Sequence, residues 1–69
     1  MIGDELKKTR EQAGMTQEQL AFEADVDRTY ISELENNKKS PTVEMLFRIC
    51  GGLGIKASEL IAAVEAEQA

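Results

Sequence analysis

The 69-residue chain has no histidine and only one cysteine, Cys50. A lone cysteine cannot form an internal disulfide, and without histidine the chain has no recognisable set of metal ligands. It also has no Cys–His pair and no glycine-rich phosphate loop, and its 13 carboxylates are scattered rather than paired. The sequence therefore argues against an enzyme and against a bound metal or cofactor.

Long apolar segments are absent as well. No run of about 18 apolar residues could span a membrane, and no basic start followed by an apolar stretch resembles a secretory signal. With a single thiol in addition, we expect a protein of the reducing cytoplasm that has no membrane partner.

Basic residues are scarce: eight Lys and Arg face thirteen Asp and Glu, which gives a net charge of −5. Because nucleic-acid-binding domains usually carry a basic footprint, this balance alone argues against DNA. However, Glu59, Glu65 and Glu67 supply −3 of the −5 in a C-terminal segment without Lys or Arg. A basic face elsewhere is therefore compatible with the sequence. Six of the eight basic residues lie in the first 39 positions: Lys7, Lys8, Arg10, Arg28, Lys38 and Lys39.

Apolar residues recur at helical spacing along the whole chain, and no alternating strand pattern is present. This predicts an all-α fold of five helices in a single domain, residues 1–69. The expected helices span about residues 2–13, 16–24, 27–36, 42–53 and 57–67. In the fourth of them we expect these side chains to face the core: Val43, Leu46, Ile49, Cys50 and Leu53.

The second and third expected helices are joined with almost nothing between them. Thr16 and Gln19 form a capping box at the start of the second helix. Asp27 is a suitable N-cap for the third helix, so only Asp25 and Val26 remain for the connection. The chain must then reverse at Asp25, a residue type that tolerates the left-handed conformation.

The segments GMTQEQLA, ADVDRTYISELENNKKSP, LFRICGGLGI and SEL, in this order, resemble the DNA-binding helix-turn-helix of the Cro/repressor-type family, also called XRE-type. The resemblance covers about residues 6–61. Within that family, RTYIS after a capping Asp is similar to restriction-modification controller proteins. The positions of Arg10 and Glu35 are similar to those of phage repressors. The family implies a five-helix lambda-repressor-like domain whose third helix, about residues 27–36, lies in the major groove.

The resemblance also implies which residues contact DNA. Arg28 would pair with O6 and N7 of guanine, and Thr29 would read a neighbouring base. Gln17, at a helix N-terminus, would contact a phosphate. Glu33 would accept a hydrogen bond from a cytosine amino group or repel a phosphate. The full implied set is Gln17, Arg28, Thr29, Tyr30, Ser32, Glu33, Asn36, Lys38 and Lys39. The alternatives are a merely solvated helix face and a Tyr30 ring packed over the second helix.

Two further positions carry structural expectations from the family. Arg10 and Glu35 match a buried ion pair of similar phage repressors, where the pair fixes the angle between helices. Asp25 departs from the glycine that often occupies the turn. Gly51 and Gly52 stand where the family usually has better helix formers, so we expect a weak last turn in the fourth helix.

A single helix-turn-helix reads only a few base pairs, whereas a two-fold dimer reads two half-sites about 34 Å apart. We therefore expect a homodimer that uses Ile61 and Val64. The sequence predicts a sequence-specific transcriptional regulator that binds a palindromic or pseudopalindromic operator in double-stranded DNA. The acidity of the chain keeps two alternatives open, namely a helical protein-interaction module and an antitoxin-like protein that also captures a protein partner.

Overall fold

The computed structural model describes residues 1–68, and in that range the chain forms five helices and no strand. The helices are α1 (Ile2–Gln12), α2 (Gln17–Ala24), α3 (Arg28–Glu35), α4 (Val43–Leu53) and α5 (Ala57–Gln68). The all-α, five-helix prediction is confirmed, and the expected helix ends lie within about one residue of the observed ones. None of the five helices is both long enough and apolar enough to cross a membrane.

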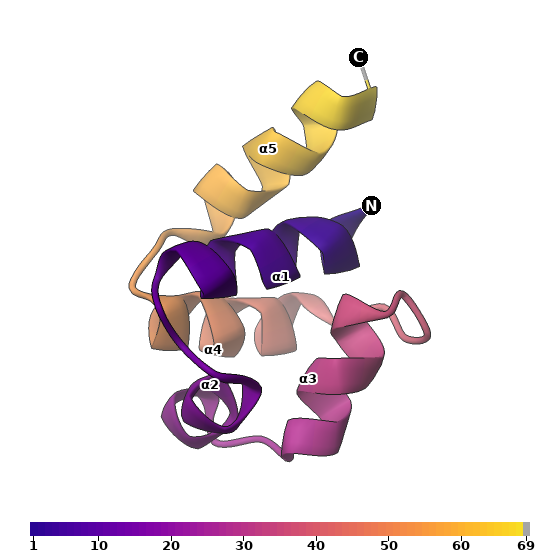
Figure 1. Ribbon diagram of the computed structural model, residues 1–69. Helices are drawn as coiled ribbons and strands as arrows, with labels where there is room; N and C mark the ends of the chain where they lie inside the picture. The colour runs from indigo at the N-terminus through magenta and orange to yellow at the C-terminus, as the bar shows by residue number, and fades with distance from the viewer. Residues whose placement is uncertain (69) are drawn as a thin grey trace.

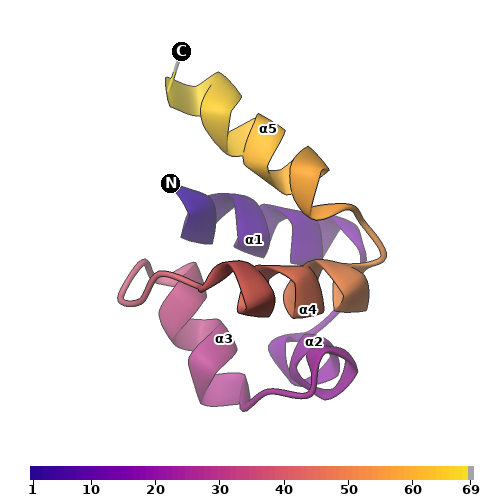
Figure 2. The same ribbon diagram turned by 180° about the vertical axis from the view of Figure 1, so that it is seen from behind.

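Helix α1 runs through the middle of the molecule and separates α5 from the α2–α3 pair (Figure 1). It packs against α3 on one side and against α5 on the other, while α2 packs against both α3 and α4. The view from behind shows the same order, with α5 at the end of the molecule opposite α2 and α3 (Figure 2). The acidic C-terminal helix is therefore held away from α3.

The core draws on all five helices. Leu6, Leu20, Ile31, Ile49 and Leu60 come from α1 to α5 in turn, and each is at most 2% exposed. Burying one such side chain contributes about 1.5–3 kcal/mol. Loss of any one helix would consequently uncover part of the shared core.

Cys50 belongs to this core. It is buried on α4, and its burial raises the pKa of the thiol above its ordinary value. A buried, protonated thiol behaves as a small apolar group.

One of the expected core residues is misplaced. The prediction that Val43 faces the core is wrong, because its side chain is 71% exposed. Leu46, Ile49, Cys50 and Leu53 are buried as expected. Val43 is the first residue of α4, so it lies one turn before the part of the helix that packs against the rest of the core.

The start of α2 has the predicted capping box. The Thr16 hydroxyl accepts a hydrogen bond from the Gln19 amide, and the Gln19 side chain accepts one from the Thr16 amide, at 3.1 and 2.7 Å. Asp27 is the N-cap of α3, but its carboxylate makes no capping hydrogen bond. Its negative charge still suits the helix dipole at that end.

The turn between α2 and α3 reverses at Asp25, which has φ of 57° as its residue type allows. The Val26 amide donates to the Ala21 carbonyl at 2.9 Å, a hydrogen bond typical of a Schellman motif. Ala21 is itself buried. The short connection predicted from the sequence is therefore accommodated without glycine.

The two adjacent glycines of α4 differ in their surroundings. A Cβ on Gly52 would lie 3.2 Å from the Glu23 Cβ and 3.3 Å from a Leu20 methyl carbon, whereas a Cβ on Gly51 would meet open space. Gly52 thus permits α4 to approach α2 closely. Only Gly51 weakens the helix without a packing contact in return.

We expect opposite effects from alanine at two glycine positions. Gly51→Ala should raise the free energy of unfolding by about 1 kcal/mol, because it adds a good helix former in open space. Gly3→Ala should lower it by about 1–3 kcal/mol, because its Cβ would lie 2.2 Å from the Leu34 carbonyl oxygen. Urea denaturation of both variants measures this, and destabilisation by Gly51→Ala would contradict the assignment of open space.

Candidate nucleic-acid interface

One face of α3 is open to solvent and bears polar side chains. Arg28, Thr29 and Asn36 are exposed, and Ser32 is half-buried. Spacings of three and four residues place them on the same side of the helix. The opposite side is anchored in the core by Ile31 and Leu34. The structure therefore gathers four of the nine residues of the implied DNA-binding set on a single helix face.

Arg28 is held by a residue from the neighbouring helix. Its Nη1 donates to the Gln17 Oε1 at 3.2 Å, which connects the first residue of α3 to the first residue of α2. An arginine held at one nitrogen still has further N–H donors in its planar fork. Such a fork can donate to two acceptors on one edge of a base or on a phosphate.

Gln17 is also hydrogen-bonded to a buried ion pair. Its Nε2 donates to the Glu35 Oε1 at 3.1 Å, and Glu35 accepts from Arg10 Nε at 2.6 Å and Arg10 Nη2 at 3.0 Å. Arg10 also donates to the Met15 carbonyl at 2.7 Å. The Glu35 carboxylate raises the pKa of Arg10 above its already high value, so the guanidinium stays charged. We name these four side chains, Arg10, Glu35, Gln17 and Arg28, the polar chain.

The polar chain also changes the role expected for Gln17. Its amide oxygen and nitrogen are both engaged, with Arg28 and Glu35 respectively. A phosphate contact at this position would therefore use the remaining amide hydrogen and the backbone N–H groups that begin α2.

Arg48, which the sequence analysis did not single out, contacts the turn between α2 and α3 at Asp25. Its guanidinium donates to the Asp25 main-chain carbonyl and lies 3.5 Å from the Asp25 carboxylate. The acidic residue at the turn thus has a basic neighbour from α4. No spacing in the sequence pairs these positions, because they are 23 residues apart and meet only in the fold.

Asn37 was likewise missed as a positioning residue. It adopts φ of 59°, its side-chain oxygen accepts from the Gly3 amide at 3.1 Å, and its Nδ2 donates to the Asp4 carboxylate at 3.1 Å. The start of α1 therefore holds the end of α3 and the loop that carries the exposed Lys38. Asn36, next to it, donates to the Ser32 carbonyl at 2.9 Å.

Tyr30, Glu33 and Lys39 form a cluster beside the open face of α3. Lys39 Nζ lies 3.4 Å from the Glu33 Oε1 and 5.7 Å from the centre of the Tyr30 ring. Tyr30 is half-buried and packs against the core. Its ring therefore serves partly in packing and partly as a surface on which Lys39 rests.

Large apolar side chains are also exposed on α4 and on α5. Val43 and Phe47, four residues apart on α4, are 71% and 64% exposed. On α5, Ile61 is 43% exposed and Val64 is half-buried.

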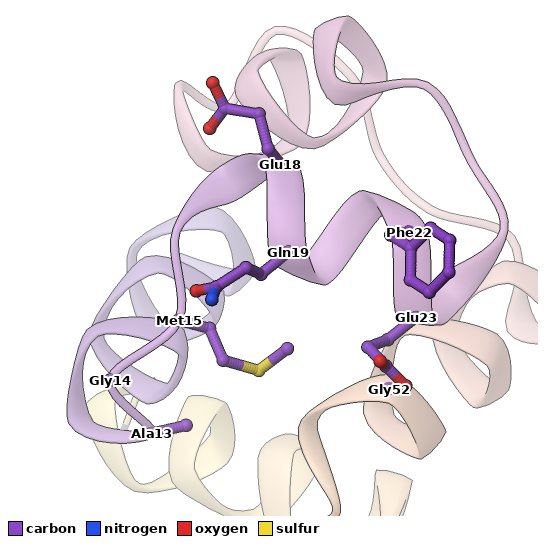
Figure 3. Close-up of a pocket in the computed structure, with 8 residues that line it drawn as sticks. All are labelled: Ala13, Gly14, Met15, Glu18, Gln19, Phe22, Glu23 and Gly52. Atoms are coloured by element: carbon purple, nitrogen blue, oxygen red, sulfur yellow. The ribbon is translucent and has the colours of Figure 1, made fainter.

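A further exposed aromatic, Phe22, lines an open groove of about 560 Å³ on α2. Phe22 is 83% exposed. It stands with Glu23 on one side of the groove, and Met15 and Gln19 stand on the other (Figure 3). Acidic and apolar groups are therefore combined in this groove.

Comparison with known proteins identifies the family of this fold and polar face. The model of the family described as "Helix-turn-helix" matches residues 6–60. The chain belongs to the XRE-type helix-turn-helix family. Its fold is lambda-repressor-like, as the resemblance implied.

The relatives include restriction-modification controllers and a phage repressor. Control protein C.MunI from Mycoplasma sp is 44% identical over 67 residues, which cover 96% of this chain and 90% of that protein. The immunity repressor protein of Bacillus phage phi105 is 32% identical over 60 residues, 87% of this chain and 42% of that protein. The structure of the controller protein C.Esp1396I, a tetramer in complex with its natural 35-base-pair operator, has a TM-score of 0.88 at 36% identity, and covers 96% of this chain and 87% of that one.

The buried pair of the polar chain gives a direct test of its role. Arg10→Met leaves the Glu35 charge buried without its partner, and should lower the free energy of unfolding by about 3–5 kcal/mol. The double variant Arg10→Met/Glu35→Leu removes both charges, and should recover most of that loss. Denaturant unfolding of the wild type and the two variants measures both steps. Equal stability of the single and double variants would contradict the role of the pair.

Proposed function

We propose that this protein is a sequence-specific transcriptional regulator that binds a palindromic or pseudopalindromic operator as a homodimer. Helix α3 enters the major groove, where Arg28 and Thr29 reach base edges near its N-terminus. Ser32 and Glu33 extend the contact by one turn. Asn36, Lys38 and Lys39 hold the phosphate backbone beyond the end of α3, and Gln17 does so beside its start.

The single observation that carries this proposal is the attachment of Arg28 to the polar chain. An exposed arginine normally samples many rotamers and loses that freedom on binding. Here Gln17 holds the guanidinium at 3.2 Å, and Gln17 is itself bound to the buried Glu35. Part of the side-chain entropy of Arg28 is therefore already lost in the free protein, which favours a bidentate contact with guanine.

The negative net charge is compatible with this function because of where the charges lie. The C-terminal helix with Glu59, Glu65 and Glu67 is at the end of the molecule opposite α2 and α3 (Figures 1 and 2). Salt screens charges separated by more than about 8–10 Å at physiological ionic strength. Carboxylates on α5 therefore repel DNA at the start of α3 less than carboxylates on α3 itself would.

A homodimer supplies what one copy lacks. One α3 reads a single half-site, and the few basic groups of one copy give modest phosphate attraction. Three exposed apolar side chains, Ile61, Val43 and Phe47, and the half-buried Val64 form the surfaces of α5 and α4 that we propose for the contact between copies. Burying them removes apolar area from water, which is the main favourable term in association.

A second candidate function is capture of a partner protein, with or without DNA binding. The exposed Phe22 beside Glu18 and Glu23 in the α2 groove is the observation that favours it (Figure 3). Salt dependence separates the two functions. Binding of DNA through phosphates weakens steeply with salt, whereas apolar contacts in a groove do not.

The DNA-reading assignment predicts different effects for two basic residues. Arg28→Ala should abolish the preference for one operator sequence, at a cost of about 1–3 kcal/mol on the preferred site. Lys38→Ala should weaken binding to all sequences alike and reduce the salt slope by about 0.9. Fluorescence anisotropy with a preferred duplex and a scrambled duplex measures both effects. An unchanged preference in Arg28→Ala would show that a different face reads the bases.

The proposed dimer contact is tested by replacing exposed apolar residues with serine. Phe47→Ser and Ile61→Ser should each raise the dimer dissociation constant, by about tenfold or more for Phe47 because it exposes more apolar area. Phe22→Ser, on the α2 groove, is the matched control and should leave dimerisation unchanged. Sedimentation equilibrium gives the constants, and an effect of Phe22→Ser alone would place the contact on α2 instead.

A further inference from the structure

Glu33 and Lys39 neutralise each other directly beside the proposed base-reading face. Lys39 Nζ lies 3.4 Å from the Glu33 Oε1, and the Tyr30 ring lies under the same ammonium at 5.7 Å. The carboxylate and the aromatic ring both favour this position of the cation. Lys39 is therefore held over α3 in the protein without DNA.

This pair is weak enough to be exchanged. The side chain of Lys39 is 52% exposed and that of Glu33 is 34% exposed. Ion pairs of such exposure contribute little to stability, because water competes with them. A DNA phosphate close to Lys39 is a stronger competitor, because its contact also releases condensed counterions. The exchange would leave Glu33 without a cation next to the phosphate backbone.

What happens to Glu33 depends on the base pair that it meets. A carboxylate has only acceptors, so in the major groove it is satisfied by the amino group of cytosine. Where the base edge presents only acceptors, as at guanine, the carboxylate is repelled. Whether Lys39 pairs with Glu33 or with a DNA phosphate therefore depends on the base pair that Glu33 faces.

We propose that Glu33 is a specificity-determining residue that acts through Lys39. On sequences that offer Glu33 no amino group, the Glu33–Lys39 ion pair persists, and the complex has one phosphate contact fewer. Where a cytosine amino group satisfies Glu33, Lys39 moves to a phosphate. The preferred complex therefore gains a base contact and a phosphate contact together. This inference rests on the proposed DNA binding by α3.

The salt dependence of binding tests this exchange. On scrambled duplex DNA, Glu33→Gln should steepen the salt slope by about 0.9, which is one additional phosphate. Between 50 and 200 mM salt this amounts to about 3.5-fold more loss of affinity than in the wild type. On the preferred operator the slope should stay as in the wild type, since Lys39 already contacts a phosphate there.

Two further variants isolate Lys39 from a general charge effect. In Glu33→Gln/Lys39→Met the additional slope on scrambled DNA should vanish. Glu65→Gln removes the same charge from an exposed position on α5, and should not change the slope.

The outcomes separate this inference from the function on which it rests. An unaltered slope for Glu33→Gln on scrambled DNA overturns it, as does an added slope that survives Lys39→Met. In either case, an operator preference that depends on Arg28 leaves the proposed function standing. If the folded wild-type protein prefers no sequence at all, the proposed function and this inference both fail.

Discussion

The buried ion pair between Arg10 and Glu35 is the interaction on which the rest of the structure depends. It joins α1 to α3, and through Gln17 it also reaches the first residue of α2 and then Arg28. Buried pairs add little net stability, because desolvation offsets their attraction. What this pair provides is geometry, since it fixes three helices and one exposed guanidinium relative to one another. A recognition surface on so small a core depends on such a constraint.

Charge is distributed in this molecule so that an acidic chain can present a usable face. The acidic α5 lies at the far end from α3, and the acid at the turn, Asp25, is paired with Arg48 (Figures 1 and 2). On α3 itself the only exchangeable acid, Glu33, is matched by Lys39. Two acidic groups near the proposed interface, Asp25 and Glu33, thus have basic neighbours, while Asp27 at the start of α3 makes no capping hydrogen bond. Net charge describes solubility and long-range attraction better than it describes a particular face.

Local signals in the sequence were sufficient for most of the fold. The capping box of Thr16 and Gln19, the reversal at Asp25 and the helical spacing of apolar residues gave five helices whose bounds are confirmed. The prediction that Val43 is buried was wrong, because apolar spacing identifies the inward face of a helix but not how far along the helix the core extends. The contacts of Arg48 and Asn37 were not predicted, because no local spacing pairs such distant positions and the family resemblance singled out only Arg10 and Glu35 as a distant pair. The roles of α3 side chains toward DNA remain predictions.

The most direct test of DNA reading by α3 is selection of bound duplexes from a random DNA library by the purified protein, at about 100 mM salt to suppress purely electrostatic binding. We expect recovery of a two-fold symmetric motif with guanine at the position that Arg28 reaches in each half. Recovery of no motif, from protein shown to be folded by circular dichroism, would contradict it. The acidic groove around Phe22 would then be the surface to examine for a protein partner.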